Sequence, residues 1–195
     1  MTHEAVPSRT GEAAQERIFI RPARADDAPE LARLAQELGY PTGAGEMHRR
    51  LGIIAGHADH AVFVAERDDR ATEGKRAAAE ASNRRILGWI HVARRLLLES
   101  GESAEILGLI VDRGARRLGI GRRLVEAAEP WSRALGLECI VVRSNVAREE
   151  SHRFYPALDF ALAKTQRVYV KRLSRSTGIC EPVRKEYLDP HEGIA

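Results

Sequence analysis

The apolar residues of this chain recur with two different spacings, which separate the expected helices from the expected strands. Apolar residues at helical spacing follow Asp26 and Asp27 and end at Gly39, which predicts a helix with one of these two aspartates as N-cap and a glycine stop. The same spacing predicts a second helix over 44–55 and a third over about 119–135, whose apolar face holds Leu124, Ala128, Trp131 and Leu135. Apolar or alternating runs predict strands at 17–21, 61–66, 85–93, 102–111, 137–143 and 164–173.

The order of these elements predicts an α/β fold, in which helices flank a mixed, largely antiparallel sheet. Pro130 interrupts the third helix, and an interior proline usually leaves a kink. The polar stretches 1–16 and 174–195 are expected to be flexible tails, so that 17–173 forms one domain. The charged, alanine-rich stretch 68–83 is too long for an ordinary hairpin loop, and predicts a disordered segment or a surface excursion.

Composition places the chain among globular proteins that bury a core. Its 195 residues are 44% hydrophobic and 30% charged, which excludes bulk disorder. It has no run of about 18 apolar residues, and its first residues lack the basic start and apolar core of a signal peptide, so we expect a cytoplasmic protein without a membrane span. Cys139, in an expected strand, and Cys180, in an expected tail, favour a reducing compartment and no disulfide.

The charge balance argues against nucleic acid as a partner. The net charge is +3, and 28 acidic residues accompany 31 basic ones. Aromatic residues make up only 5% of the chain and do not interleave with lysines, as they do in proteins that bind single strands. The arginines gather instead in the stretch 109–123, which reads Leu-Ile-Val-Asp-Arg-Gly-Ala-Arg-Arg-Leu-Gly-Ile-Gly-Arg-Arg.

The stretch 109–123 joins an expected strand to an expected helix through a loop that is suited to an anion. Gly119 and Gly121 let the backbone approach a ligand closely, and the first N–H groups of the helix point outward at an end that carries about +0.5 charge. The cluster contains Arg113, Arg116, Arg117, Arg122 and Arg123. A cofactor that carries a pyrophosphate is the simplest ligand for so many positive charges.

Spacing separates the known phosphate loops from one another. A P-loop is excluded because no lysine follows Gly119 or Gly121, and the dinucleotide fingerprint would need a glycine where Leu124 stands. The pattern Arg116-x-x-Gly119-x-Gly121 resembles the acetyl-CoA loop of the GCN5-related N-acetyltransferases (GNAT). The resemblance covers about 17–173 and is strongest in its second half.

A second stretch, 144–160, is similar to the Asn…Phe-Tyr…Leu-Gly-Phe segment of the same family. Asp159 stands where the family has glycine, so we expect a turn made by a residue that tolerates left-handed geometry less well. The resemblance implies that the fourth and fifth strands splay apart and that the pantetheine arm of acetyl-CoA binds the backbone of the fourth strand. It implies these cofactor-binding residues: Leu109, Ile110, Val111, Arg116, Arg117, Leu118, Gly119, Ile120, Gly121, Arg122 and Asn145.

The resemblance also implies the reaction, in which an acetyl group moves from acetyl-CoA, a co-substrate, to a primary amine by direct attack in a ternary complex. We expect a small-molecule amine rather than a protein. Tyr155 is the expected proton donor for the departing thiolate, because a phenol with a pKa of about 10 is protonated at pH 7. The alternative is a tyrosine packed at a helix end. Asn145, ahead of the same helix, caps it, reaches the pantetheine arm, or does both.

Glu105 is the expected general base, because members of this family often use a glutamate on the fourth strand. The alternative is an exposed charge at the start of a strand. His91 is expected to be a buried, hydrogen-bonded histidine rather than a catalytic one. No metal site is expected, because the histidines lack the spacing of paired ligands. On the acceptor side, Glu46 and Glu66 are, with His91, candidates to attract a cation.

Two functions of other classes stay open at this point. A catalytically silent acyl-CoA-binding module would keep the loop and dispense with Tyr155 and Glu105. A nucleic-acid-binding protein would use its arginines on phosphates and lose affinity as salt rises. Proteins of this fold often pair through sheet edges, so a homodimer is the expected assembly.

Overall fold

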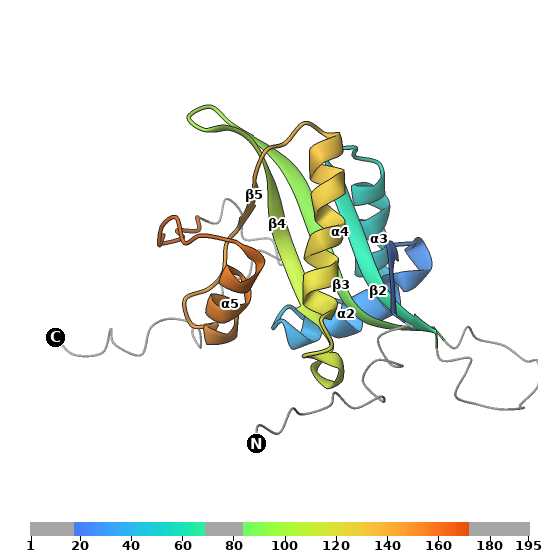
Figure 1. Ribbon diagram of the computed structural model, residues 1–195. Coiled ribbons are helices and arrows are strands. Elements are labelled where there is room, and N and C mark those ends of the chain that lie inside the picture. The colour runs from blue at the N-terminus through green and yellow to red at the C-terminus, as the bar shows by residue number, and fades with distance from the viewer. Residues whose placement is uncertain (1–17, 69–83, 172–195) are drawn as a thin grey trace, which may run out of the picture. The chain divides into compact units, whose positions relative to one another are not determined.

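A computed structural model of the chain describes residues 18–68 and 84–171 (Figure 1). These residues form two compact units that divide between Arg143 and Ser144, and each unit is described by itself. The first contains a five-stranded sheet in the order β1-β2-β3-β4-β5. The expected tails lie outside the described residues, and so does the expected excursion at 68–83 except for Asp68, the last residue of a strand.

The sheet is mixed and largely antiparallel, which confirms the predicted fold class. Its strands are β1 (Ile18–Pro22), β2 (His60–Asp68), β3 (Arg84–Leu97), β4 (Gly101–Val111) and β5 (Ile140–Val142). The pairs from β1 to β4 are antiparallel, and β5 runs parallel to β4.

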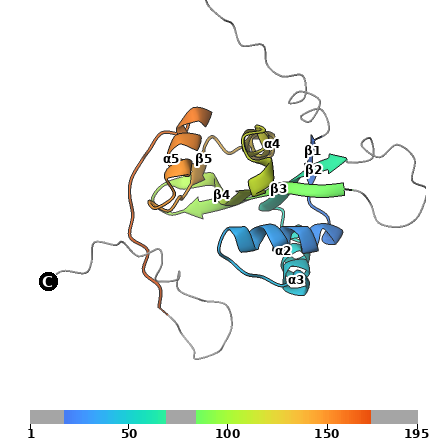
Figure 2. The same ribbon diagram turned by 90° about the horizontal axis from the view of Figure 1, so that it is seen from below.

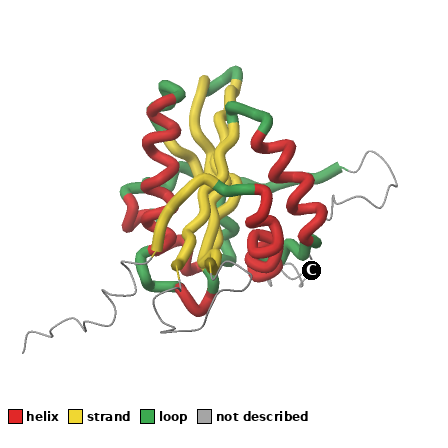
Figure 3. The backbone as a smooth tube through the Cα atoms, turned by 90° about the vertical axis from the view of Figure 1, so that its right-hand side faces the viewer, coloured by secondary structure: helices red, strands yellow, loops and turns green. Residues whose placement is uncertain are grey.

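Helices cover both faces of this sheet. Figure 2 shows α2 (Ala28–Glu37) and α3 (Ala44–Ala55) on one face and α4 (Ile120–Ala134) on the other, and Figure 3 shows the strands as a twisted layer between helices. These three helices lie within two residues of their predicted bounds. Asp27 occupies the N-cap of α2, and Gly39, just beyond its end, has a φ of 89°.

The core lies on both sides of the sheet because each helix presents one apolar face to it. On α4 this face consists of Ile120, Leu124, Val125 and Ala128, all buried. Gly88 of β3 makes the close approach possible, since a Cβ there would lie 2.7 Å from the carbonyl oxygen of Ile110 and 3.3 Å from a methyl carbon of Leu124. On the opposite face, Leu31 and Leu34 of α2 pack with Leu51 of α3, Val64 and Ile86.

A β-bulge in β4 interrupts the pairing with β3. His91 pairs with Gly108 and Val92 with Ile106, so Leu107 is an extra residue without a partner in β3. Such a bulge bends its strand and increases the local twist. The pairing between β4 and β5 ends at the same place, because it covers only Ala104–Ile106 of β4. The two strands therefore separate beyond Ile106, as the family resemblance implies.

Of two strand predictions from the second half of the chain, one is confirmed only in part and the other is wrong. The stretch 137–143 contributes only Ile140–Val142 to the sheet, and Cys139, expected inside this strand, is exposed just ahead of it. Residues 164–171 form no strand and are exposed, and 172–173 lie outside the described residues. An alternating pattern shows which side chains can share a face, but a strand also requires a hydrogen-bonded neighbour.

Pro130 lies inside α4, which continues on both sides of it. An interior proline costs about 3 kcal/mol relative to alanine, because it removes an N–H donor and its ring clashes with the preceding turn. Since Pro130 is exposed, core packing does not offset this cost. We expect Pro130→Ala to raise the free energy of unfolding by about 1–3 kcal/mol, measured by urea denaturation. A lower free energy of unfolding in this variant would show that the proline is needed for the path of α4.

Candidate active site

The join between β4 and α4 has the geometry of an anion-binding loop. Gly119 is the N-cap of α4 and has a φ of 75°, a conformation that favours glycine. The hydrogen-bond ladder of α4 begins with Arg123, whose N–H donates to the carbonyl of Gly119 over 3.1 Å. The N–H groups of residues 120–122 therefore precede the ladder. No acidic residue lies in the first turn of α4, so the positive end of the helix is not neutralised from within that turn.

The predicted arginine cluster divides into loop residues and one structural residue. Arg116 and Arg117 are exposed in the loop itself, and Arg117 has a φ of 66°. Arg122 is exposed in the first turn of α4, with its guanidinium 4.0 Å from Glu126. Arg123 turns away and donates to the carbonyl of Ile18 in β1 over 2.7 Å. Its role is therefore to tie α4 to the edge strand.

Asp112, which the sequence analysis did not single out, fixes the start of this loop. One carboxylate oxygen accepts from the N–H of Gly114 over 2.9 Å, and the other accepts from Arg33 over 2.9 Å and Arg85 over 3.0 Å. Burial raises the pKa of Asp112, but these three donors outweigh it and hold the pKa below its ordinary value. The loop is thereby anchored to α2 and β3.

The end of β4 offers backbone to a ligand on the side where β5 has separated. Leu109, Ile110 and Val111 pair with β3 on one side and lie beyond the three residues that pair with β5. The side chain of Leu107, at the bulge, is 48% exposed. The loop and this strand edge are continuous in sequence, so one extended ligand can contact both.

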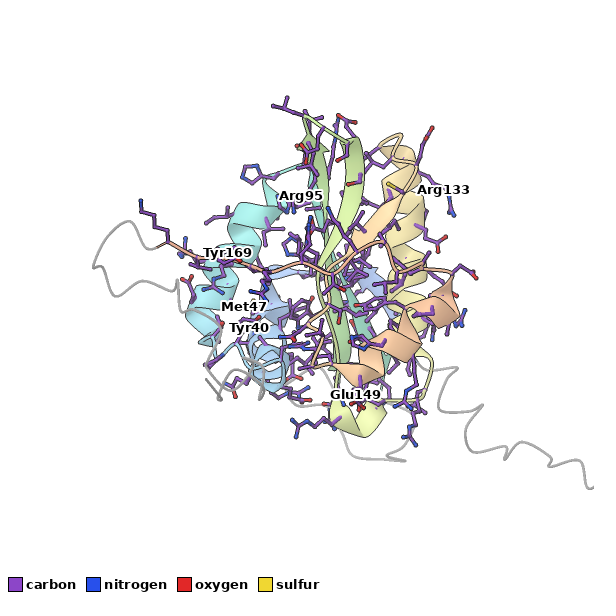
Figure 4. All side chains as sticks on the ribbon, turned by 90° about the vertical axis from the view of Figure 1, so that its left-hand side faces the viewer. Tyr40, Met47, Arg95, Arg133, Glu149 and Tyr169 are labelled. Carbon is purple, nitrogen blue, oxygen red and sulfur yellow. The ribbon has the colours of Figure 1, made fainter. Side chains whose placement is uncertain are left out.

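Glu105 is buried, so the alternative interpretation, an exposed charge at a strand start, is wrong. It forms ion pairs with Arg95 of β3 and with Arg143, which follows β5, and each carboxylate oxygen has one guanidinium partner. Figure 4 shows Arg95 on the same side of the sheet as Met47 of α3, and Arg133 of α4 on the other side. Burial raises the pKa of Glu105, but the two ion pairs outweigh it and hold the pKa below its ordinary value.

A pair of histidines lies on the same face of the sheet. Nδ1 of His60, at the start of β2, is 3.0 Å from Nε2 of His91 in β3, and the two ring centroids are 5.3 Å apart. Burial, together with the positive charge of His60, lowers the pKa of His91 to about 4. His91 is therefore hydrogen-bonded, as the sequence predicts, but only half-buried, and it is neutral at pH 7.

The lowered pKa of His91 predicts that the protein loses stability as the pH falls. Between pH 6.5 and 4 the unfolded chain binds a proton at this histidine and the folded chain does not, so the free energy of unfolding decreases over this window. The loss is on the order of 3 kcal/mol at most. Urea denaturation between pH 7 and 4.5 should show this slope, and His91→Gln should flatten it. An equal slope in both proteins would contradict the prediction.

The two glutamates that were candidates to attract a cation are both engaged by arginines. Glu46 of α3 accepts from Arg49 and Arg50, each over 2.8 Å, which lowers its pKa to about 2. Glu66 of β2 forms an ion pair with Arg21, which also binds Asp27 over 2.7 Å. Their negative charge is therefore offset by neighbouring arginines rather than presented to a cationic ligand.

The second unit contains α5 (Glu149–Phe154) and the 3-10 helix η3 (Pro156–Leu158), with Tyr155 between them. The ring of Tyr155 packs edge-on against Phe154 and Phe160, with centroids 5.1 Å and 5.5 Å away. Burial raises the pKa of Tyr155, and the opposing effect of Arg148 is smaller. The phenol is therefore protonated at neutral pH, as a proton donor must be.

Asn145 does not cap α5, which corrects one of its two expected roles. The N-cap of α5 is Arg148, and the side-chain oxygen of Asn145 accepts from the N–H of Ala147 over 2.9 Å, in the turn before the helix. An Asn side chain readily closes such a turn with the backbone two residues later. Asp159 has a φ of 64°, so it does adopt the left-handed turn where the family has glycine.

The part of the chain that the structure describes has neither a cluster of metal-binding side chains nor a helix able to cross a membrane. No group of three or more histidine, cysteine, aspartate or glutamate side chains in residues 18–68 and 84–171 is arranged to hold a metal ion. Within the same residues, no helix has both the length and the apolar character needed to cross a membrane.

Comparison with known proteins gives both a family and a fold. A model of the acetyltransferase (GNAT) family matches residues 30–160. Over 61 residues the chain is 33% identical to an uncharacterized N-acetyltransferase, YhdJ, of Bacillus subtilis (strain 168). That match spans 31% of this chain and 43% of the relative, so it covers less than half of the relative's length.

Solved structures similar to this one include several N-acetyltransferases. Glucosamine-6-phosphate N-acetyltransferase from Arabidopsis thaliana has a TM-score of 0.61 at 21% identity, over 78% of this chain and 97% of that one. Aminoglycoside 6'-N-acetyltransferase AAC(6')-Ih from Acinetobacter baumannii has a TM-score of 0.63 at 16% identity, over 80% and 99%. AAC(6')-Iy in complex with CoA has a TM-score of 0.66 at 17% identity, over 80% and 95%. At these identities the likeness shows a shared fold.

Proposed function

Since the chain belongs to the acetyltransferase (GNAT) family, we propose that it transfers an acetyl group from acetyl-CoA to the primary amine of a small molecule. The observation that carries this proposal is the start of α4. Gly119 has a left-handed φ, the first turn of α4 has no acidic residue, and Arg116 and Arg122 flank the glycines. This donor set suits a diphosphate, which carries charge and several acceptor oxygens.

We place the cofactor along one continuous stretch of the first unit. The diphosphate would lie against the N–H groups of Gly119, Ile120, Gly121 and Arg122, with Arg116, Arg117 and Leu118 completing the loop. The pantetheine arm would bind the backbone of Leu109, Ile110 and Val111, which β5 leaves unpaired on its side. Asn145 stays a predicted contact of the same arm. Acetyl-CoA supplies an activated acyl group, and the protein has to hold it in place.

Acetyl transfer then requires that the amine be positioned, that it lose a proton, and that the departing thiolate gain a proton. A well-oriented pair of reactants gains roughly 7–11 kcal/mol over free encounter, which makes placement the largest contribution. The neutral amine attacks the thioester carbonyl carbon directly, and backbone N–H groups of β4 polarise the carbonyl. Tyr155 is the proposed donor of a proton to the departing sulfur, and its protonated phenol supports this role.

The general base is a separate question. Glu105 was predicted for this role from its place in β4, and it stays a prediction. Its two ion pairs favour the ionised form, but they also lower its affinity for a proton. The same ion pairs favour the second candidate function, a catalytically silent acyl-CoA-binding module, because such a module needs no base.

The acceptor class rests on weaker support than the cofactor. Structures similar to this one include an enzyme named for glucosamine 6-phosphate and several named for aminoglycosides, which are small amines. Among the described residues, Glu46, Glu66 and Glu105 each have an arginine partner. This pairing favours an amine of low positive charge, such as an amino sugar phosphate, over a polycationic aminoglycoside. A homodimer and a cytoplasmic location stay predictions.

An assay of thiol release tests the proposed function. The full chain is incubated with acetyl-CoA and a panel of amines that includes glucosamine 6-phosphate and neamine, and the acetylated product is identified by mass spectrometry. Thiol release that depends on one amine, with an equal amount of N-acetylated product, would support the enzyme. Cofactor binding by calorimetry without turnover of any amine would favour the silent module instead.

A further inference from the structure

The hydrogen bond between His60 and His91 constrains the protonation of both rings. Their nitrogens, Nδ1 of His60 and Nε2 of His91, lie 3.0 Å apart, so one must carry a hydrogen and the other a lone pair. If both rings were imidazolium ions, each nitrogen would be a donor and the bond would be lost. The hydrogen bond therefore requires one ring to donate and the other to accept.

The two rings lie in different parts of the sheet. His91 lies in the central strand β3, and its burial keeps it neutral down to a pH of about 4. His60 lies at the start of β2, and both histidines are partly buried. When the neutral His91 accepts through Nε2, His60 donates through Nδ1, and Nε2 of His60 then carries the lone pair. In this tautomer the free ring nitrogen of the pair is Nε2 of His60, at the start of β2.

The register of the sheet places His60 in line with Glu105. His60 pairs with Ala93 in β3, and Ala93 pairs with Glu105 in β4, so the three residues form one row across the sheet. His60 and Glu105 are separated by two strand spacings of about 4.8 Å each, and only the small side chain of Ala93 stands between them. Leu107, where β5 separates from β4, is two residues beyond Glu105. His60 and the ion-paired Glu105 thus lie in one row of the sheet, close to the point where β5 separates from β4.

Resting on the proposed function, we propose that Nε2 of His60 accepts the proton of the acceptor ammonium, directly or through one water, and that His91 holds His60 in the tautomer that can do so. In this step an N–H bond of the ammonium breaks and its electron pair stays on the amine nitrogen. A new N–H bond forms at Nε2 of His60, and the imidazolium later returns the proton to water. His60 is the catalytic residue and His91 the positioning residue.

The test uses the amine with the highest kcat/KM in the panel. His60→Gln should lower kcat at least 100-fold while the Kd for acetyl-CoA, measured by calorimetry, changes less than twofold. His57→Gln is the matched control, because His57 is exposed and its ring centroid lies 6.1 Å from that of His60. Added imidazole should restore part of the activity of His60→Ala. Glu105→Gln should lower kcat less than His60→Gln does.

The role of His91 is tested by two substitutions that differ in hydrogen bonding. His91→Gln keeps an acceptor for the N–H of His60 and should retain more of kcat than His91→Leu, which keeps none. Equal losses in both would show that His91 acts only by packing.

The outcomes separate this inference from the function on which it rests. If wild-type protein turns over an amine and the kcat of His60→Gln is within threefold of the wild-type kcat, the histidine pair is not the base. Loss of kcat in Glu105→Gln alone would contradict the inference and support the carboxylate. If wild-type protein turns over no amine, the proposed function is wrong and this inference falls with it.

Discussion

Gly121→Glu is expected to weaken the binding of acetyl-CoA at least 100-fold. Gly121 is the second residue of α4, where the N–H groups of the first turn are not yet part of the helix ladder. A glutamate there adds bulk and a negative charge at the place proposed for the diphosphate. Because an acidic residue in the first turn favours a helix, the substitution should not unfold α4. Titration calorimetry with CoA measures the effect on binding, and the melting temperature shows that the fold is retained.

Gly45→Glu is the matched control for this variant. Gly45 is the second residue of α3, and a Cβ placed on it meets nothing within 4 Å. The same chemical change at the start of another helix should leave the affinity for CoA within twofold of wild type. Equal weakening in both variants would point to a general effect of added negative charge. Wild-type affinity in Gly121→Glu would show that the diphosphate does not bind at the start of α4.

Tyr155→Phe is expected to lower kcat about 100-fold or more and to leave the Kd for acetyl-CoA nearly unchanged. The substitution removes only the hydroxyl, and the ring can keep its edge-on contacts with Phe154 and Phe160. Loss of the proton donor should therefore affect the departure of the thiolate and not the binding of the cofactor. Steady-state kinetics with the best amine, together with calorimetry, separates these effects.

Tyr169→Phe serves as the control for the loss of a tyrosine hydroxyl. Tyr169 belongs to the same unit, and its side chain is 86% exposed (Figure 4). This variant should keep wild-type kcat. If Tyr155→Phe also kept kcat within threefold, Tyr155 would be a packed tyrosine at a helix end, and another group would protonate the thiolate.

The helices and the first four strands could be predicted because their signals are local. The apolar spacing of α2, α3 and α4 and the glycine after α2 lie within each element, so one stretch of sequence is enough. The bulge at Leu107 could not be predicted, since it depends on the register between β3 and β4. The stretch 164–171 has the alternation of a strand and forms none, because alternation says nothing about a pairing partner.

The candidate site, too, could be predicted from the sequence only in part. The loop from Arg116 to Gly121 could be found because its residues are contiguous and their spacing is specific. The anchoring of Asp112 by Arg33 joins residues 79 positions apart, and the His60–His91 bond joins residues 31 apart. Neither pair leaves a pattern in the sequence, since folding brings its members together. The burial of Glu105 was missed because its two arginine partners lie on other strands or beyond them.

The central claim is that main-chain N–H groups at the start of α4 hold the diphosphate of coenzyme A. A crystal structure of the protein grown with CoA tests it most directly. We expect diphosphate oxygens within hydrogen-bond distance of the N–H groups of residues 119–122, with the pantetheine arm along Leu109–Val111. A diphosphate bound elsewhere, or a loop whose own side chains fill this position while CoA is bound, would contradict it.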